Sequence, residues 1–233
     1  MAVKLFRTPS TNYMRPKHVL LLGLMLLVPV LAFVFLYTFG TNRYALPTFL
    51  PDQVDSTLVE GKWRRDTVFH QLGDFQLASQ SGRLVSQKDL GAGIYVANFF
   101  FATCPGACPR MNSQMARVQE KFRQEPRVKL VSYTVDPEHD SVAVLGRYAE
   151  QYGAIAGKWF FLTGDKTVLY RLATEEFRLP APSGAAPGIV HSQNLYLIDR
   201  DKRVRGIYDG MKPKDVDRLM TEINVLLYTY DHN

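Results

Sequence analysis

An uncharged stretch near the N-terminus constrains this chain more than any other feature of its sequence. Residues 19–39 are 21 consecutive residues without a charged side chain. As an α-helix the stretch would measure about 31 Å, which matches the roughly 30 Å hydrocarbon core of a bilayer. A cleaved signal peptide is the main alternative, but its apolar part is normally about 7–15 residues long and precedes a small-residue cleavage site. Residues 37–43 offer no such site. The sequence therefore predicts a transmembrane helix at 19–39.

The charges on the two sides of this stretch predict its orientation. Residues 1–18 carry four basic residues and no acidic one, whereas Arg43 is the only basic residue among the next twenty. Cytoplasmic flanks of membrane helices are enriched in Lys and Arg. We therefore expect a cytoplasmic leader at 1–18 and a single-pass protein of the bacterial inner membrane, with its domain in the periplasm. The mitochondrial inner membrane is the less favoured location.

The charge balance of the remaining chain argues against a nucleic-acid partner. The formal net charge is +6, and the leader supplies +4 of it. The rest of the chain is therefore nearly neutral and has no basic stripe to neutralise a row of phosphates.

The pattern beyond the stretch predicts a tether followed by an α/β domain. Residues 40–62 contain two prolines followed by a polar run, which is typical of a tether. The domain is expected at 63–233, where apolar runs alternate with helical periodicity. Strands are predicted at 94–101, 128–135, 159–162, 195–198 and 204–208, and helices at 111–122, 142–152, 168–172 and 213–227. This order predicts a mixed sheet with helices on both faces, and it suits a thioredoxin-like fold.

The chain has only two cysteines, Cys104 and Cys108, and they lie where the first predicted strand turns into a helix. The N-terminus of a helix carries partial positive charge, which lowers the pKa of a thiol placed there. Positions i and i+4 lie on one side of a helix, so the two sulfurs can share one metal ion or form a disulfide. Zinc is disfavoured because a structural site needs four ligands. Copper binding, thiol–disulfide exchange and a structural disulfide stay open.

Copper would accept two thiolates together with an imidazole, so the histidines are the next candidates. His18 precedes the predicted span, His232 lies at the C-terminus, His70 lies in a polar stretch, and His139 lies in the loop 136–141. His191 instead follows a Pro- and Gly-rich loop and precedes the strand predicted at 195–198. Loops at strand ends are where the sites of open α/β sheets collect, so His191 is a candidate third ligand. A lone histidine is more often a surface or hydrogen-bonded residue, so both interpretations of His191 stay open on position alone.

Four further residues near this site have two interpretations each. Asp136 and Asp140 either orient the site from outside the ligand set or cap the helix that begins near Ser141. Met111 and Met115 carry thioethers that could bind copper, but their helical spacing favours packing in the core.

Three segments together resemble the Sco/SenC family: residues 99–109 with both cysteines, 134–141, and 190–199 with His191. The resemblance covers roughly residues 65–227. It implies a membrane-tethered, thioredoxin-like copper protein that helps assemble the CuA centre of cytochrome c oxidase. Positions that match Cys104, Cys108 and His191 would hold Cu(I) or Cu(II). The implied partners are the copper-bearing oxidase subunit and either another copper chaperone or a thiol reductase.

Two residues depart from the family pattern, and one other function is compatible with the motif. Gly106 and Val190 stand where the family often has Asp, so negative charge near the metal is lost. We therefore expect a difference in copper affinity, in oxidation-state preference or in partner docking. The alternative function is a membrane-tethered thiol:disulfide oxidoreductase that acts on partner cysteines. Such enzymes usually have a CxxC motif beside Trp, whereas Thr103 precedes this CxxxC motif. A peroxidase would need Thr where Phe101 stands, and a binding domain with an inert disulfide is the non-catalytic alternative. A metallochaperone is preferred, and whether the chain is also an enzyme stays open.

Overall fold

The computed structural model describes residues 16–39, 46–59, 62–180 and 192–232, and the chain forms two compact units, Met1–Tyr44 and Ala45–Asn233. The first unit contains helix α1 (Pro16–Phe39), as the sequence predicts. Its segment Leu20–Thr38 is long and apolar enough to cross a membrane, and its apolar side chains are exposed. A signal sequence near an N-terminus would meet the same test of length and composition.

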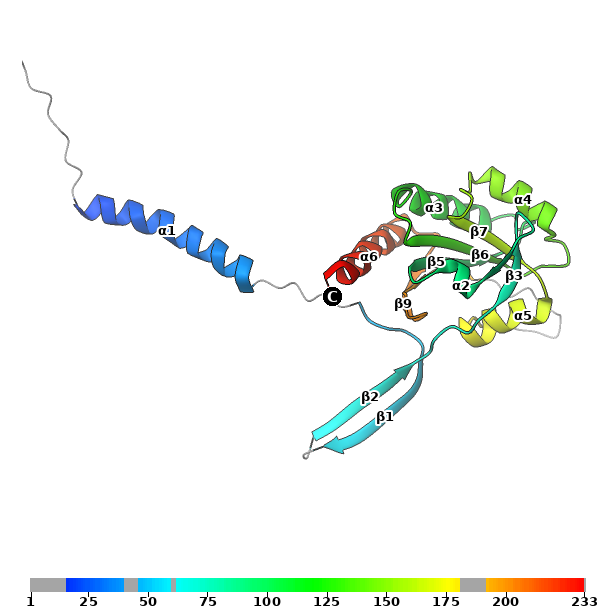
Figure 1. Ribbon diagram of the computed structural model, residues 1–233, viewed down its shortest axis with the longest axis horizontal. Helices are drawn as coiled ribbons and strands as arrows, with labels where there is room; N and C mark the ends of the chain where they lie inside the picture. Colours follow the sequence, from blue (N-terminus) through cyan, green and yellow to red (C-terminus); the bar gives the residue numbers. More distant parts are fainter. Residues whose placement is uncertain (1–15, 40–45, 60–61, 181–191, 233) are drawn as a thin grey trace, which may run out of the picture. The chain divides into compact units, whose positions relative to one another are not determined.

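The second unit is built on a mixed seven-stranded sheet in the order β4-β3-β7-β6-β5-β8-β9 (Figure 1). The strands are β3 (Gln76–Ser79), β4 (Leu84–Ser86), β5 (Ile94–Phe100), β6 (Val128–Thr134), β7 (Trp159–Thr163), β8 (Asn194–Ile198) and β9 (Val204–Asp209). β5, β6 and β7 run parallel, and the other pairs are antiparallel. All seven residues of β5 are buried, which confirms the central strand that its apolar sequence predicts.

Helices cover both faces of the sheet, as expected, and each face has its own hydrophobic cluster. The first face packs against α3 (Ala107–Lys121), α4 (Val142–Gln151) and α6 (Pro213–His232). The second face packs against α2 (Gln87–Leu90), α5 (Lys166–Arg171) and the π-helical turn η1 (Leu172–Glu176). Met111 and Met115 are buried in the first cluster, which confirms that they pack in the core.

The structure differs from the expected tether at residues 40–62. Pro51–Val59 forms strand β1, which pairs antiparallel with β2 (Lys62–Phe69). The segment before β1 is docked on the domain: Phe49 N–H donates to Val204 O at 2.8 Å, and the Leu46 side chain is buried in the first cluster. Prolines at 47 and 51 suggest a linker, but the β-branched residues Val54, Thr67 and Val68 suit a pair of strands. Of the predicted tether, only residues 40–45 and 60–61 lie outside the described residues.

Candidate metal centre

The two cysteines come together at the head of α3. Cys104 lies in the turn after β5 and is partly exposed, whereas Cys108 lies in the first turn of α3 and is buried. Both are free thiols, and Cys108 N–H donates to Cys104 Sγ at 3.4 Å. The structure therefore places the pair at the strand–helix junction, where the strand and helix patterns predict it, and the two thiols lie together, as their four-residue spacing predicts.

The two thiols differ in acidity because they differ in burial and in hydrogen bonding. Burial acts to raise the pKa of Cys104, but hydrogen bonds from the Cys108 side chain and from three backbone N–H groups together lower it below its ordinary value. Those N–H groups belong to Gly106, Ala107 and Cys108. Burial, together with its hydrogen bond to Cys104, raises the pKa of Cys108 to about 12. Cys104 is thus the more acidic thiol of the pair and Cys108 the less acidic one.

This asymmetry predicts selective alkylation of the reduced protein. At pH 8 we expect iodoacetamide to modify Cys104 at least about tenfold faster than Cys108, because only the thiolate is nucleophilic. Peptide mass spectrometry would follow both sites. In matched variants, Cys108→Ser should be labelled rapidly and Cys104→Ser should stay nearly unlabelled. Faster labelling of Cys108 would contradict the assignment.

Asp140 connects the cysteine loop to the end of β6. Its buried carboxylate accepts from Ala102 N–H at 3.1 Å and from the Thr134 hydroxyl at 2.5 Å. Burial raises the pKa of Asp140, and the two hydrogen bonds oppose that rise only in part. Because Ala102 lies two residues before Cys104, this carboxylate fixes the backbone from which the thiol projects.

The expectation that Asp136 or Asp140 caps the following helix is wrong. The N-cap of α4 is Ser141, whose hydroxyl accepts from Val144 N–H at 3.4 Å. The Asp136 carboxylate instead lies 2.9 Å from His139 Nδ1. Of the two interpretations, the contacts of Asp140 with the cysteine loop agree with an orienting role.

Two histidines of the described domain, His70 and His139, are paired with carboxylates. His139 is largely exposed, and its hydrogen bond to Asp136 and the charge of that carboxylate raise its pKa. His70 lies between two carboxylates at the base of β2. His191, the preferred third ligand, and Val190 lie outside the described residues. Within the described residues, no group of three or more His, Cys, Asp or Glu side chains could hold a metal ion.

A buried polar network lies beneath the cysteine helix, and sequence reasoning missed it. Asn98 on β5 donates to Asn112 Oδ1 at 3.0 Å and accepts from the Ser132 hydroxyl at 2.6 Å. Asn112 on α3 also donates to the Tyr148 hydroxyl, and Trp159 Nε1 donates to Ser132. These bonds connect α3 to β5, β6, β7 and α4. The available signal was the presence of Asn98 and Ser132 inside otherwise apolar strands.

The glycine that departs from the family pattern lies at the N-cap of α3. A Cβ atom added to Gly106 would meet no atom within 4 Å. An aspartate would therefore fit at this position, and the departure changes charge rather than packing.

Comparison with known proteins identifies similar sequences and folds. The SCO1/SenC family model matches residues 65–227. The SCO1 protein homolog of Bacillus subtilis (strain 168) is 28% identical over 167 residues, which cover 70% of this chain and 86% of that protein.

Solved structures show the same architecture. One similar structure is that of BsSco, a member of the Sco family of cytochrome c oxidase assembly proteins in which a disulfide switch has been identified. It superposes with a TM-score of 0.59 at 26% identity, and the match covers 67% of this chain and 93% of that one. Arabidopsis thaliana ScoI with copper bound gives a TM-score of 0.57 at 25% identity, covering 68% and 99%. These likenesses confirm the thioredoxin-like fold.

Proposed function

The chain belongs to the SCO1/SenC family, and we propose that it is a membrane-anchored metallochaperone that delivers copper to the CuA site of cytochrome c oxidase. The observation that carries this proposal is the pair of free thiols at the head of α3, one of them partly exposed and with a lowered pKa. Two soft thiolates suit copper, particularly Cu(I). The copper-bound ScoI structure supports the same cargo in this chain.

The proposed ligands are Cys104, Cys108 and His191, with copper as cargo rather than as a resident cofactor. Metal binding requires deprotonated thiols and a neutral imidazole. Cys104, the more acidic and more exposed thiol, would form the first bond to copper, and binding by Cys108 would then require loss of its proton to solvent. Because Cys104 is partly exposed, a ligand of the acceptor can reach the copper and exchange with it. Asp140 would keep the thiol loop in place from outside the ligand set.

The proposed location follows from α1. A membrane span at residues 19–39, with the basic leader in the cytoplasm, places the domain in the periplasm of a bacterial inner membrane. Confinement to the membrane of the acceptor raises the effective concentration of the two proteins, so transfer does not require a tight complex. The copper-bearing oxidase subunit is the proposed acceptor, and a thiol reductase would keep the cysteines reduced.

The second candidate is thiol–disulfide exchange, which the asymmetry of the pair supports. A thiolate beside a protonated thiol is the arrangement that attacks a disulfide. The disulfide switch described for BsSco belongs to a similar protein. In this function the same cysteines would reduce partner cysteines without metal.

A copper titration separates the two functions. The full chain in lipid nanodiscs, reduced and freed of reductant, would be titrated anaerobically with Cu(I) and in air with Cu(II). We expect one copper per chain, followed by transfer to a purified apo CuA subunit. A protein that fails to retain copper but cycles readily with dithiol substrates would be assigned as an oxidoreductase instead.

A further inference from the structure

The β1–β2 hairpin exposes an apolar face. Leu58 lies directly opposite Trp63 in the register, and Val54 lies on the same face because alternate strand residues share a face. Their exposed fractions are 55% for Val54, 59% for Leu58 and 72% for Trp63. In the described part of the second unit, most other large apolar side chains are buried. An exposed Trp beside an exposed Leu indicates an interaction surface.

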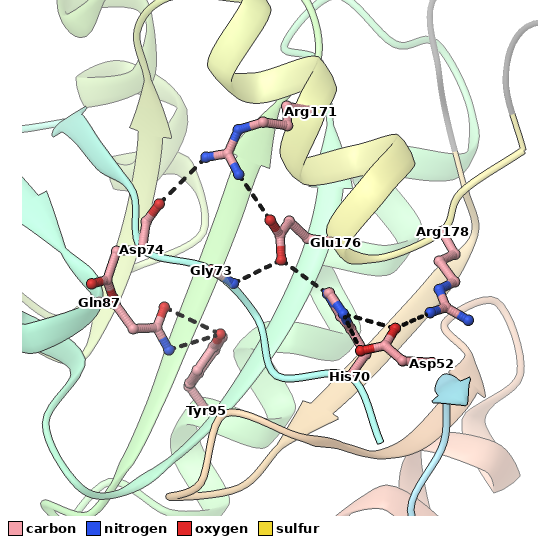
Figure 2. Close-up of polar contacts among 9 residues, drawn as sticks. All are labelled: Asp52, His70, Gly73, Asp74, Gln87, Tyr95, Arg171, Glu176 and Arg178. Carbon is pink, nitrogen blue, oxygen red and sulfur yellow. Dashed lines mark hydrogen bonds and ion pairs between the residues drawn. The ribbon is translucent and has the colours of Figure 1, made fainter. Parts of the chain in front are cut away.

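The hairpin is a separate two-stranded sheet whose base is fixed to the domain by charged groups. Figure 2 shows His70 between two carboxylates: Nε2 lies 2.9 Å from Glu176 Oε2, and Nδ1 lies 3.2 Å from Asp52 Oδ2. Arg178 pairs with Asp52 at 2.5 Å and donates to Pro51 O at 2.8 Å. Glu176 is further held by Gly73 N–H and by Arg171. These contacts join the start of β1 and the residue after β2 to η1 and the residues that follow it.

The stretch of chain between α1 and the hairpin is short. Leu46 is buried in the domain core, and only residues 40–45 lie between it and Phe39 at the end of α1. The seven Cα–Cα steps from Phe39 to Leu46 span at most about 25 Å. β1 begins five residues after Leu46, and a nine-residue strand is about 30 Å long. If α1 spans a membrane, the surface of that membrane is within reach of the hairpin.

The composition of the hairpin changes from base to tip. Residues 58–65 contain three basic residues and one acidic residue, and Trp63 stands among the basic ones. Asp52 and Asp55 lie toward the base. Trp is enriched at membrane–water interfaces, and basic residues near the surface are attracted to anionic headgroups. The tip thus combines the two residue types that bind an anionic bilayer surface.

We propose that the tip of the β1–β2 hairpin binds the headgroup region of the anionic bilayer that α1 spans, with Leu58 and Trp63 as its apolar contacts. This inference rests on the proposed anchoring by α1 and goes beyond copper transfer. Contact at a second point fixes how the domain faces the membrane, which a single tether does not.

Lipid quenching of tryptophan fluorescence tests this contact in the full chain. The chain has two tryptophans, and Trp159 is fully buried, so Trp63→Phe isolates the Trp63 signal by difference. The protein would be placed in nanodiscs of phosphatidylglycerol and phosphatidylcholine, with and without brominated acyl chains. We expect brominated lipid to reduce the Trp63 emission at least about twofold and to leave Trp159 unchanged. Zwitterionic nanodiscs should give weaker quenching of Trp63.

Matched variants and alternative outcomes make the test decisive. Leu58→Ser should weaken the quenching of Trp63, whereas Val68→Ser, equally exposed on the opposite face, should not.

Trp63 emission that responds to acrylamide but not to brominated lipid would overturn the proposal. Emission shielded from both quenchers would assign the face to a protein partner or a second copy and would also overturn it. Failure of the chain to incorporate into nanodiscs contradicts the anchoring by α1, and with it this contact. A chain that binds no copper but still shows lipid quenching of Trp63 would contradict the proposed function and not the membrane contact.

Discussion

Replacing Cys104 or Cys108 with serine is expected to abolish stoichiometric copper binding, with an affinity loss of more than about 100-fold. Loss of a group that only orients a ligand typically costs about 10–100-fold, and loss of a ligand itself costs more. A hydroxyl stays protonated at neutral pH and cannot replace a soft thiolate. His191→Ala is expected to give a loss of the same order. Competition with a Cu(I) chelator under anaerobic conditions would measure all three affinities.

The controls for these variants come from the same chain. His70→Ala and His139→Ala remove histidines that pair with carboxylates elsewhere, so copper affinity should stay within about twofold of the unmodified chain. Asp140→Asn should fall between these groups, at about 10–100-fold, because Asp140 holds the thiol loop without being a proposed ligand. If His191→Ala binds copper with full affinity while Cys104→Ser and Cys108→Ser do not bind it, His191 is not a ligand.

Asn98→Ala is expected to reduce the free energy of unfolding by about 3 kcal/mol. The substitution leaves the Asn112 carbonyl without its donor and the Ser132 hydroxyl without its acceptor, both in the core. Each buried polar group left without a partner costs about 1–3 kcal/mol, and the removed side chain also leaves a small cavity. Urea denaturation of the apo protein in nanodiscs, followed by the fluorescence of the buried Trp159, would give the difference.

Asn224→Ala on the exposed surface of α6 is the matched control. Its side chain donates only to Met220 O within its own helix, so the expected change is below about 0.5 kcal/mol. Equal stability losses in the two variants would show that the network beneath α3 contributes nothing specific.

The sequence predicted the elements whose burial pattern is simple. β5, β6 and β7 are apolar runs buried on both faces, and α3 and α6 carry their apolar residues at helical spacing. The i, i+4 spacing also predicted the convergence of the two thiols. Their unequal acidity could not be predicted in the same way. It depends on how deeply Cys108 enters the first cluster and on which N–H groups surround Cys104, and both are set by tertiary packing.

The elements that were missed are short or mainly polar. β3 and β4 have four and three residues, too few for a period to be recognised. β1 and β2 contain many charged residues, so their sequence does not have the apolar pattern of a strand. Their apolar face becomes visible only when the two strands are paired in register. The role of Asp140 depends on a contact with Ala102, 38 positions earlier in the chain, which no local pattern encodes.

The sheet separates two structural environments that can diverge independently in evolution. Cys108 and the residues beneath α3 pack on one face, whereas Phe177 and Leu179, which flank the hairpin-binding Arg178, pack on the other. Effects of substitutions that share no packing partner are usually additive. A lineage can therefore accumulate changes on the hairpin-bearing side, adapting to a new membrane or neighbour, without compensating substitutions around the thiols. The reverse also holds, so the proposed copper site and the proposed membrane contact can change independently in one small domain.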